Sequence, residues 1–296
     1  MGRQADRGLG VNEECLKLTI YFGERDRAQG RFLTDALTEI YARHQLQASL
    51  VMRGVEGFGV KHHLRTDRLL TLSEDLPLVS VAVDARPRIE AALAEVNKLR
   101  FDGLVTIERA RMLAGRVMPI RFPPDPHEEV KLTVYVGRHE RVAGRPAYEK
   151  VVDLLHRCGI AGATVLLGVD GTAHGTRQRA RFFGANTYVP LMVIAVGDGH
   201  RIDERLPELG ESLPRPLVTL ERVRVCKRDG QLLAEPRRLP ETDRSGLGVW
   251  QKLMVYAGEQ ARSDGQPLHH QLIRRLRHAG AAGATSLRGI WLSRRP

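Results

Sequence analysis

Residues 16–23, LKLTIYFG, return as VKLTVYVG at residues 130–137 and as QKLMVYAG at residues 251–258. In each copy apolar and polar side chains alternate, which is the pattern of a β-strand with one buried face. Residues 104–109, LVTIER, also return, as LVTLER at residues 217–222. A segment that recurs at long intervals indicates a tandem array, so the fold must be read from one repeat. The first two repeats are complete, and the third runs only about half-way.

Between its two repeated strands, the first copy carries the signals of two helices and two further strands. Apolar residues recur at helical spacing over residues 32–44, and a second helix begins near Pro87. Strands are predicted at residues 48–55 and 77–83, separated by a loop rich in glycine and charge at residues 56–65. The order βαββαβ is that of ferredoxin-like domains, with both helices on one face of a four-stranded antiparallel sheet. We therefore expect an α+β protein of tandem ferredoxin-like units.

The other face of the predicted sheet has no helices to cover it. Residues 78–83, LVSVAV, are nevertheless apolar on both faces of their strand. Such a sheet needs a partner against its bare side. In the second copy, Pro207 is expected to shorten or kink the helix predicted at residues 201–209.

Changes in composition divide the chain into units and linkers. The predicted divisions are a first unit at 15–113, a Pro-rich linker at 114–129, a second unit with a degenerate loop at 130–226, a charged linker at 227–247 and a partial third unit at 248–296. Neither linker has the residues of a catalytic site.

The third copy offers a strand, a helix and a strand, predicted at residues 252–258, 267–278 and 284–289. Its final residues, 291–296, are unlike the glycine-rich loops of the other copies. Half a unit cannot complete its own sheet, so its apolar residues need cover from elsewhere. Two interpretations remain open. The fragment docks on the first two units as a pseudo-trimer within one chain, or a longer third unit has been truncated and the fragment is poorly ordered.

The chain of 296 residues carries a formal net charge of +11 and a pI near 10.0, which favours an anionic partner. Aromatic residues make up only 5% of the chain, so stacking platforms for nucleic acid are scarce and nucleic acid is an unfavoured partner. The three cysteines have neither zinc-binding nor disulfide-framework spacing. The polar N-terminus lacks a signal sequence. We expect a cytoplasmic protein.

The glycine-rich loop of the first copy is the best candidate for ligand binding. Gly57 and Gly59 flank Phe58, so the backbone can adopt positive φ and present N–H groups to an anion. Positive charge follows at residues 61–65, and a phosphate-bearing ligand would fit. The alternative is a flexible loop whose glycines only permit a turn. Neither common nucleotide-binding fingerprint is present.

Four motifs in the first repeat resemble the PII-like family catalogued as domain of unknown function 190. They are YFGE at residues 21–24, RGVEGFG at 53–59, LSEDLP at 72–77 and GLVT at 103–106. The resemblance covers nearly all of the first unit, is weaker in the second, and in the third extends only as far as Gly289. A tandem arrangement resembles a subset of bacterial members.

This resemblance implies a ferredoxin-like fold that assembles as a trimer. PII proteins bind adenine nucleotides in clefts between subunits and use a long loop after the second strand to regulate transporters or enzymes. Genes of the family often accompany fluoride-exporter genes. The positions of this chain to which a ligand-binding role carries over are Glu24, Gly57, Phe58, Gly59, Arg65 and Thr66. Arg65 stands where the family usually has histidine, which keeps positive charge but loses a titratable group.

Other groups of polar residues give weaker signals. The pairs His62-His63 and His269-His270 lack the carboxylate or cysteine that would complete a metal site. Asp75 is expected to shape the turn into the third strand, and no catalytic triad stands out. We therefore expect a non-enzymatic PII-like regulator that binds a small anionic ligand, an adenine nucleotide for example, and regulates a partner such as a membrane transporter. The alternatives are a basic nucleic-acid-binding protein and a ligand-free assembly scaffold.

Overall fold

Antiparallel β-strands dominate the structure, which is a computed structural model. It describes residues 11–58, 64–66, 75–114, 129–160, 162–173, 176–179, 190–233, 235, 240–242, 246 and 248–294. The predicted α+β class is confirmed. Among the described residues, no helix is both long and apolar enough to cross a membrane.

The first unit is built around its central strand β1. Its strands and helices are β1 (Val11–Gly23), α1 (Leu33–Arg43), β4 (Ala48–Phe58), β6 (Pro77–Ala85), α2 (Arg86–Val96) and β7 (Leu104–Ala114). The strands lie in the order β4-β6-β1-β7, with every neighbouring pair antiparallel. Leu18 and Ile20 are fully buried on the face that packs against the helices. Each such side chain contributes roughly 1.5–3 kcal/mol by its burial.

The second unit repeats this arrangement. Its elements are β8 (Glu129–Gly137), α3 (Ala147–Arg157), β11 (Gly162–Leu167), β14 (Pro190–Asp198), α4 (Gly199–Asp203), α5 (Leu206–Ser212) and β15 (Leu217–Val223). The strand order is β15-β8-β14-β11. The effect predicted for Pro207 is confirmed, because two short helices replace a single one and Pro207 lies in the first turn of α5. That turn tolerates proline because its N–H groups have no helical partner.

A short hairpin precedes the first helix of each repeat. The hairpins are β2–β3 (Arg27–Ala28, Arg31–Phe32), β9–β10 (Arg141–Val142, Arg145–Pro146) and β18–β19 (Arg262–Ser263, Gln266–Pro267). Each has two turn residues with positive φ, the second of them glycine, such as Gln29 and Gly30. This is the geometry of a type I′ turn, which matches the twist of the strands. A further hairpin of this kind, β16–β17 (Lys227–Arg228, Gln231–Leu232), lies in the segment predicted as a charged linker.

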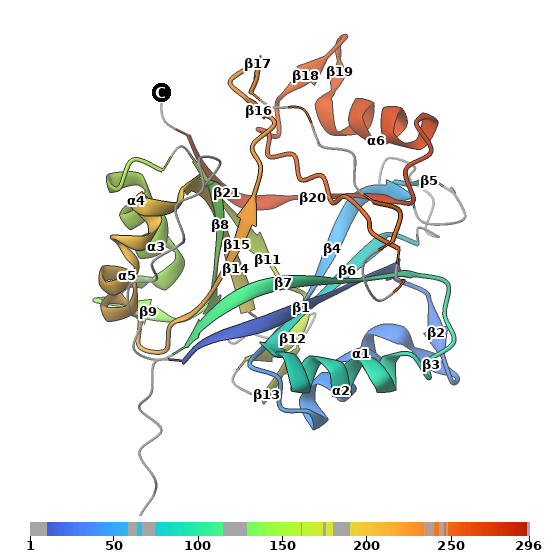
Figure 1. The fold of residues 1–296 in the computed structure, drawn as a ribbon. Coiled ribbons are helices and arrows are strands. Elements are labelled where there is room, and N and C mark those ends of the chain that lie inside the picture. Colours follow the sequence, from blue (N-terminus) through green and yellow to red (C-terminus); the bar gives the residue numbers. More distant parts are fainter. Residues whose placement is uncertain are drawn as a thin grey trace, which may run out of the picture.

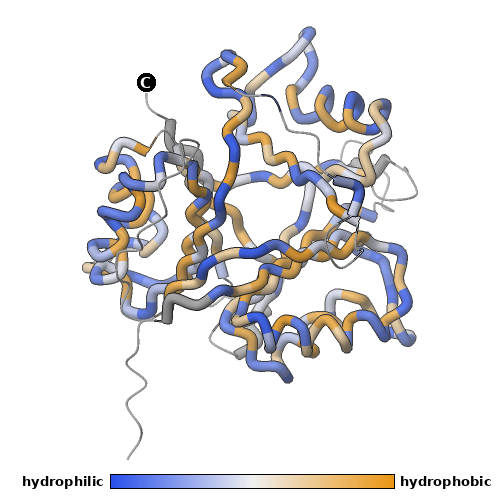
Figure 2. The backbone as a smooth tube through the Cα atoms, viewed as in Figure 1, coloured by the Kyte–Doolittle hydropathy of each residue, from blue (hydrophilic) through white to orange (hydrophobic). Residues whose placement is uncertain are grey.

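The bare faces of the two sheets pack against each other. An apolar cluster on these faces combines side chains of the first unit, such as Val81 and Met112, with side chains of the second, such as Met192 and Ile194. Leu287 of the third repeat packs at its edge. The prediction that the sheet needs a partner is thus confirmed, and that partner is the other repeats of the same chain. Hydrophobic residues run along the strands of both units (Figure 2).

The third repeat consists of α6 (Leu268–His278), β20 (Ala284–Leu287) and β21 (Gly289–Arg294). The helix and the strand predicted at residues 267–278 and 284–289 are confirmed. The strand predicted at residues 252–258 is wrong, because no strand is formed there. In the other repeats this strand lies between two neighbours, and a strand needs such neighbours for its hydrogen bonds.

Four strand pairs join the repeats: β7 of the first unit pairs with β15 of the second, and three further pairs close a ring of all three repeats (Figure 1). β12 (Asp170–Ala173) of the second unit pairs with the start of β4, the end of β4 pairs with β20, and β21 pairs with β11. The registers are equivalent: Gly57 lies opposite Thr285, and Gly171 lies opposite Leu50. Residues 291–294, which the sequence did not assign to this role, form part of β21. The third repeat therefore docks on both complete units, as one of the two interpretations predicted.

Candidate functional site

The end of strand β4 is the place where the predicted loop meets the third repeat. β4 continues to Phe58, so the first residues of the predicted loop at 56–65 belong to a strand. One edge of this strand end pairs with β5 (Leu64–Thr66), and the other edge pairs with β20. Two segments more than 200 residues apart in the sequence thus lie side by side.

Gly57 permits this close pairing and does not form the expected anion-binding turn. A Cβ atom added at Gly57 would lie 2.5 Å from the carbonyl oxygen of Ala284, a distance that real Cβ atoms do not adopt. At the equivalent position of the second unit, a Cβ on Gly171 would lie 2.2 Å from the carbonyl oxygen of Ser49. The prediction of positive φ at Gly57 is wrong, because the residue lies in extended backbone within the ladder. Glycine is needed here so that two backbones can approach each other.

Glu56 is the central charged group of the junction. Its side chain is only 1% exposed, and its Oε1 lies 2.7 Å from Nδ1 of His270 on α6. Nε2 of His269 lies 3.8 Å from the other carboxylate oxygen, Oε2, which is buried and forms no hydrogen bond with the described residues. A buried carboxylate is costly unless cations or hydrogen-bond donors surround it. His270 therefore supplies the hydrogen-bond partner of Oε1, whereas Oε2 has only the more distant ring of His269 beside it.

A more exposed ion pair lies at the edge of the same junction. Nη2 of Arg53 lies 2.8 Å from Oε2 of Glu24, and both side chains are more than a third exposed. The third repeat forms the matching pair between Arg288 and Glu259, at 3.1 Å. Pairs at such exposed positions contribute little to stability, about 0–1 kcal/mol. Arg53 is thus free to exchange its carboxylate partner for a ligand at small cost.

The remaining predicted site residues fall into three groups. Phe58 is buried at the end of β4. The backbones of Arg65 and Thr66 pair with Gly57 and Glu56 in the β4–β5 ladder. Gly59 and the basic residues 61–63 lie outside the described residues.

Asp75 has the turn-forming role that was predicted for it. Its Oδ1 accepts a hydrogen bond of 2.8 Å from the backbone N–H of Arg25. The N–H of Glu24 in turn donates to the carbonyl oxygen of Leu76, at 2.9 Å. These bonds fix the entry to β6 next to the end of β1, and with it the position of Glu24.

The second unit keeps the buried acid but lacks the rest of the site. Asp170 occupies the position of Glu56 and is 2% exposed. Arg138 and Leu167 stand where the first unit has Glu24 and Arg53, so the second unit cannot form that ion pair. The combination of buried acid, histidine pair and exposed arginine is found at the junction of the first and third repeats. Among the described residues, no group of three or more histidine, cysteine, aspartate or glutamate side chains could hold a metal ion.

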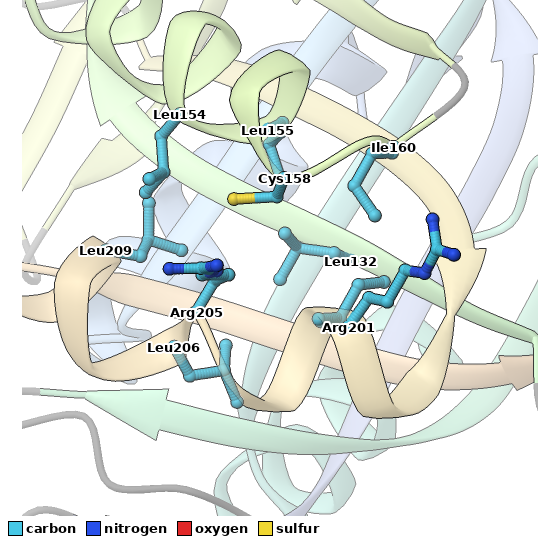
Figure 3. Close-up of a pocket in the computed structure, with 10 residues that line it drawn as sticks. Leu132, Leu154, Leu155, Cys158, Ile160, Arg201, Arg205, Leu206 and Leu209 are labelled. Carbon is cyan, nitrogen blue, oxygen red and sulfur yellow. The ribbon is translucent and has the colours of Figure 1, made fainter.

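A separate small pocket lies between α3 and the pair α4–α5 (Figure 3). Leucine side chains and Ile160 line most of it, and Arg201 and Arg205 are its charged residues. Burial raises the pKa of the Cys158 thiol, which also lines the pocket. The cavity of about 10 Å³ has room for no more than a single water molecule. It is therefore a gap in helix packing and is too small for a nucleotide.

Glu56 and its contacts with His269 and His270 were not predicted from the sequence. The histidine pair was considered only as a metal ligand, and 214 residues separate His270 from Glu56. One signal was present: an acid recurs at the same position of the two complete repeats, as Glu56 and Asp170. Its partner could not be identified from one sequence.

Comparison with protein families identifies a match that extends over most of the chain. The family DUF190, described as "Uncharacterized ACR, COG1993", matches residues 15–112, 129–225 and 250–292. These three segments correspond to the three repeats.

Single-unit relatives show the same correspondence. A UPF0166 protein of Aquifex aeolicus (strain VF5) is 27% identical over 96 residues, which is 32% of this chain and 90% of that protein. A UPF0166 protein of Methanocaldococcus jannaschii is 26% identical over 99 residues, which is 33% of this chain and 91% of that protein. One repeat of this chain thus corresponds to nearly the whole of each relative.

Two solved structures show only distant similarity. A protein described as a glycine cleavage system transcriptional repressor is 12% identical, covers 72% of this chain and 98% of its own, and has a TM-score of 0.22. The aspartate kinase of Synechocystis is 9% identical, covers 73% of this chain and 45% of its own, and has a TM-score of 0.21. At such TM-scores neither structure carries an argument about this chain.

Proposed function

This chain belongs to the DUF190 family, and on that premise we propose that it is a non-enzymatic, PII-like regulatory protein of the cytoplasm. Two ferredoxin-like units, at 15–113 and 130–226, and a partial one at 248–296 form a pseudo-trimer within one chain. The strand order in each complete unit supports this proposal. Numbered along the chain, the strands of the first unit lie in the order 2-3-1-4, and those of the second unit lie in the reverse order, 4-1-3-2, which is the order of a ferredoxin-like sheet. The ligand is a small anion, an adenine nucleotide by preference, bound where the first and third repeats meet.

The contact of His270 with Glu56 is the observation that carries this proposal. It brings a helix of the third repeat against the end of β4, from which the chain continues into the predicted loop. A ligand that bridges these two segments would favour the closed junction over an open one. To shift the equilibrium toward the closed junction, the ligand needs only to bind the closed state more tightly than the open one. Closure would rearrange the loop that a partner, such as a transporter, recognises.

The charges at the junction suit a nucleotide. Arg53 and Arg288 are exposed arginines held by weak ion pairs, and Arg65 follows on β5. Guanidinium groups bind phosphate oxygens in a bidentate manner. Oε2 of Glu56 is buried and has no hydrogen-bond partner among the described residues, so a ligand that enters the junction would offer it an amino or hydroxyl group, as adenine and ribose do. A ligand with both kinds of group matches the site better than a simple anion does.

Thermal unfolding with and without ligand tests the proposal. ATP, ADP, AMP, cyclic AMP, phosphate and sulfate would each be added to the whole chain. A ligand at one hundred times its Kd stabilises the protein by about 2.7 kcal/mol, which raises Tm by roughly 5–10 °C. Arg53→Ala should remove most of this increase. Arg145→Ala is the matched control, since Arg145 is an equally exposed, ion-paired arginine of the second unit.

Three outcomes would decide against the proposal. If no nucleotide or anion raises Tm, the protein is better described as a ligand-free scaffold. If Arg53→Ala and Arg145→Ala reduce the shift equally, the site lies elsewhere. Salt-dependent binding of a labelled DNA duplex, with no nucleotide effect, would favour the nucleic-acid alternative.

A further inference from the structure

Lysines and glutamates alternate where the repeats meet on their inner faces. Lys17, Lys131 and Lys252 occupy the same position of the three repeats, and Glu108 and Glu221 occupy the same position of two fourth strands. Oε2 of Glu221 lies 2.5 Å from Nζ of Lys17 and 2.6 Å from Nζ of Lys131. Glu108 contacts Lys17 and lies 2.5 Å from Nζ of Lys252. The described residues thus form an open row of five charges, with a lysine at each end.

The two end lysines have one carboxylate each, whereas the central lysine has two. The side chain of Lys131 is only 6% exposed, and its other contact is Sδ of Met254, at 3.8 Å. A buried ammonium group is costly unless carboxylates surround it. Burial and the neighbouring Lys17 lower the pKa of Lys131 to about 8. Burial also lowers the pKa of Lys17, but the carboxylates of Glu221 and Glu108 outweigh burial, so the pKa of this lysine is raised.

The backbone next to Lys252 lacks neighbours in the same region. In the first two repeats the equivalent strands, β1 and β8, each pair with a strand on both edges. Residues 252–257 form no strand pair with any described residue. Leu253 is 63% exposed and Val255 52%, although the equivalent residues of β1 and β8 are buried. This region therefore combines exposed apolar side chains and an unpaired backbone with two lysines that each contact only one carboxylate.

We propose that residues 252–257 are a docking site for a β-strand of another protein, which places a glutamate or aspartate carboxylate between Lys131 and Lys252. The two complete repeats show what such an occupant resembles. In each of them this position is filled by a fourth strand with apolar residues and a glutamate, such as β15. Binding by strand addition combines backbone hydrogen bonds with side-chain selection, and here the carboxylate gives the selection. This inference does not depend on the nucleotide site.

A second copy of this chain does not have the chemistry of the occupant. Its strands β7 and β15 carry the glutamates, but Glu108 and Glu221 already lie opposite Lys17 and Lys131 of their own chain and contact these lysines. Its own residues 252–257 would bring Lys252 toward Lys131, which places like charges together. A separate polypeptide with a free, acidic strand satisfies both requirements.

A labelled peptide tests the proposal with the whole chain. The probe is PLVTLERV, the sequence of residues 216–223, and its matched control carries glutamine in place of glutamate. Fluorescence anisotropy should show that the glutamate peptide binds at least about tenfold more tightly, as expected for a charge-assisted hydrogen bond. Lys131→Met should remove this difference. In this variant Glu221 keeps its contact of 2.5 Å with Lys17, so no buried carboxylate is left unpaired. We therefore expect the fold to be retained, which urea unfolding would show.

Val255→Pro tests strand addition without changing any charge. Proline removes a backbone donor and blocks pairing, while the unpaired segment tolerates it in the free protein. Peptide binding should be lost in this variant, with its urea midpoint unchanged. The proposal is overturned if neither peptide binds, if both bind equally, or if Val255→Pro binds as the unaltered chain does. A homodimer that forms through residues 252–257 and excludes the peptide would also overturn it.

Discussion

Gly171→Ala tests the ring of strand pairs that holds the repeats together. The added Cβ would lie 2.2 Å from the carbonyl oxygen of Ser49 and 2.9 Å from Cγ of Pro190. The oxygen belongs to the backbone of β4 and cannot rotate away, so β12 must move from β4 by about 1 Å. Overpacking of this kind costs about 1–3 kcal/mol, and each weakened backbone hydrogen bond adds roughly 1 kcal/mol. We expect a loss of about 2–4 kcal/mol in the free energy of unfolding.

Urea unfolding measures this loss as a shift of the midpoint at constant slope. Gly137→Ala is the control, because its nearest neighbours would lie at 3.7–3.9 Å, which is ordinary contact. It should change stability by no more than about 0.5 kcal/mol. Equal effects of the two substitutions would refute the close pairing of β12 with β4.

Three further predictions concern buried titratable groups. Glu221→Gln leaves the ammonium of Lys131 without its carboxylate and should cost about 3 kcal/mol in urea unfolding; a cost below about 1 kcal/mol would contradict the row of charges. Burial raises the pKa of Glu108, but the nearby lysines outweigh burial and lower this pKa from 4.5 to about 2. The ionised carboxylate therefore stabilises the fold above pH 4.5, and this stabilisation is lost as the pH falls from 4.5 toward 2. Glu108→Gln should therefore flatten the dependence of stability on pH in that window, and an unchanged acid limb would count against it. Burial raises the pKa of Cys15 to about 12, so a thiol reagent at pH 8 should label the partly exposed Cys226 first and label Cys15 only on unfolding; labelling at equal rates would place Cys15 at the surface.

The repeat made the units predictable from the sequence, because each unit folds on local patterns. Alternation predicted the cores of β1 and β8, and helical spacing predicted α1 to within one residue at each end. The junctions between repeats were not predictable, since their registers join strands more than 100 residues apart. The apolar pattern required a partner for the bare faces but did not specify which strands would pair.

Gly57 shows why the site was harder to predict than the fold. A glycine in the sequence is compatible both with a backbone of positive φ and with the close approach of another backbone. At Gly57 only the position of Ala284 in the structure shows that close approach is the reason. Residues 252–258 have the alternating sequence pattern of a strand but lack the neighbouring strands that would hold one in place, so the pattern alone predicted a strand that does not form. Glu56 was within the recognised motif, but its partners on α6 come from the repeat that matched the family least.

Hydrogen exchange with and without ATP tests the central claim most directly. The claim is that one ligand bridges the end of β4 and the third repeat. It predicts that ATP slows exchange together at residues 54–58 and in α6 and β20, and not around the pocket between α3 and α5. Slower exchange in only one of these segments, or in the second unit alone, would contradict it.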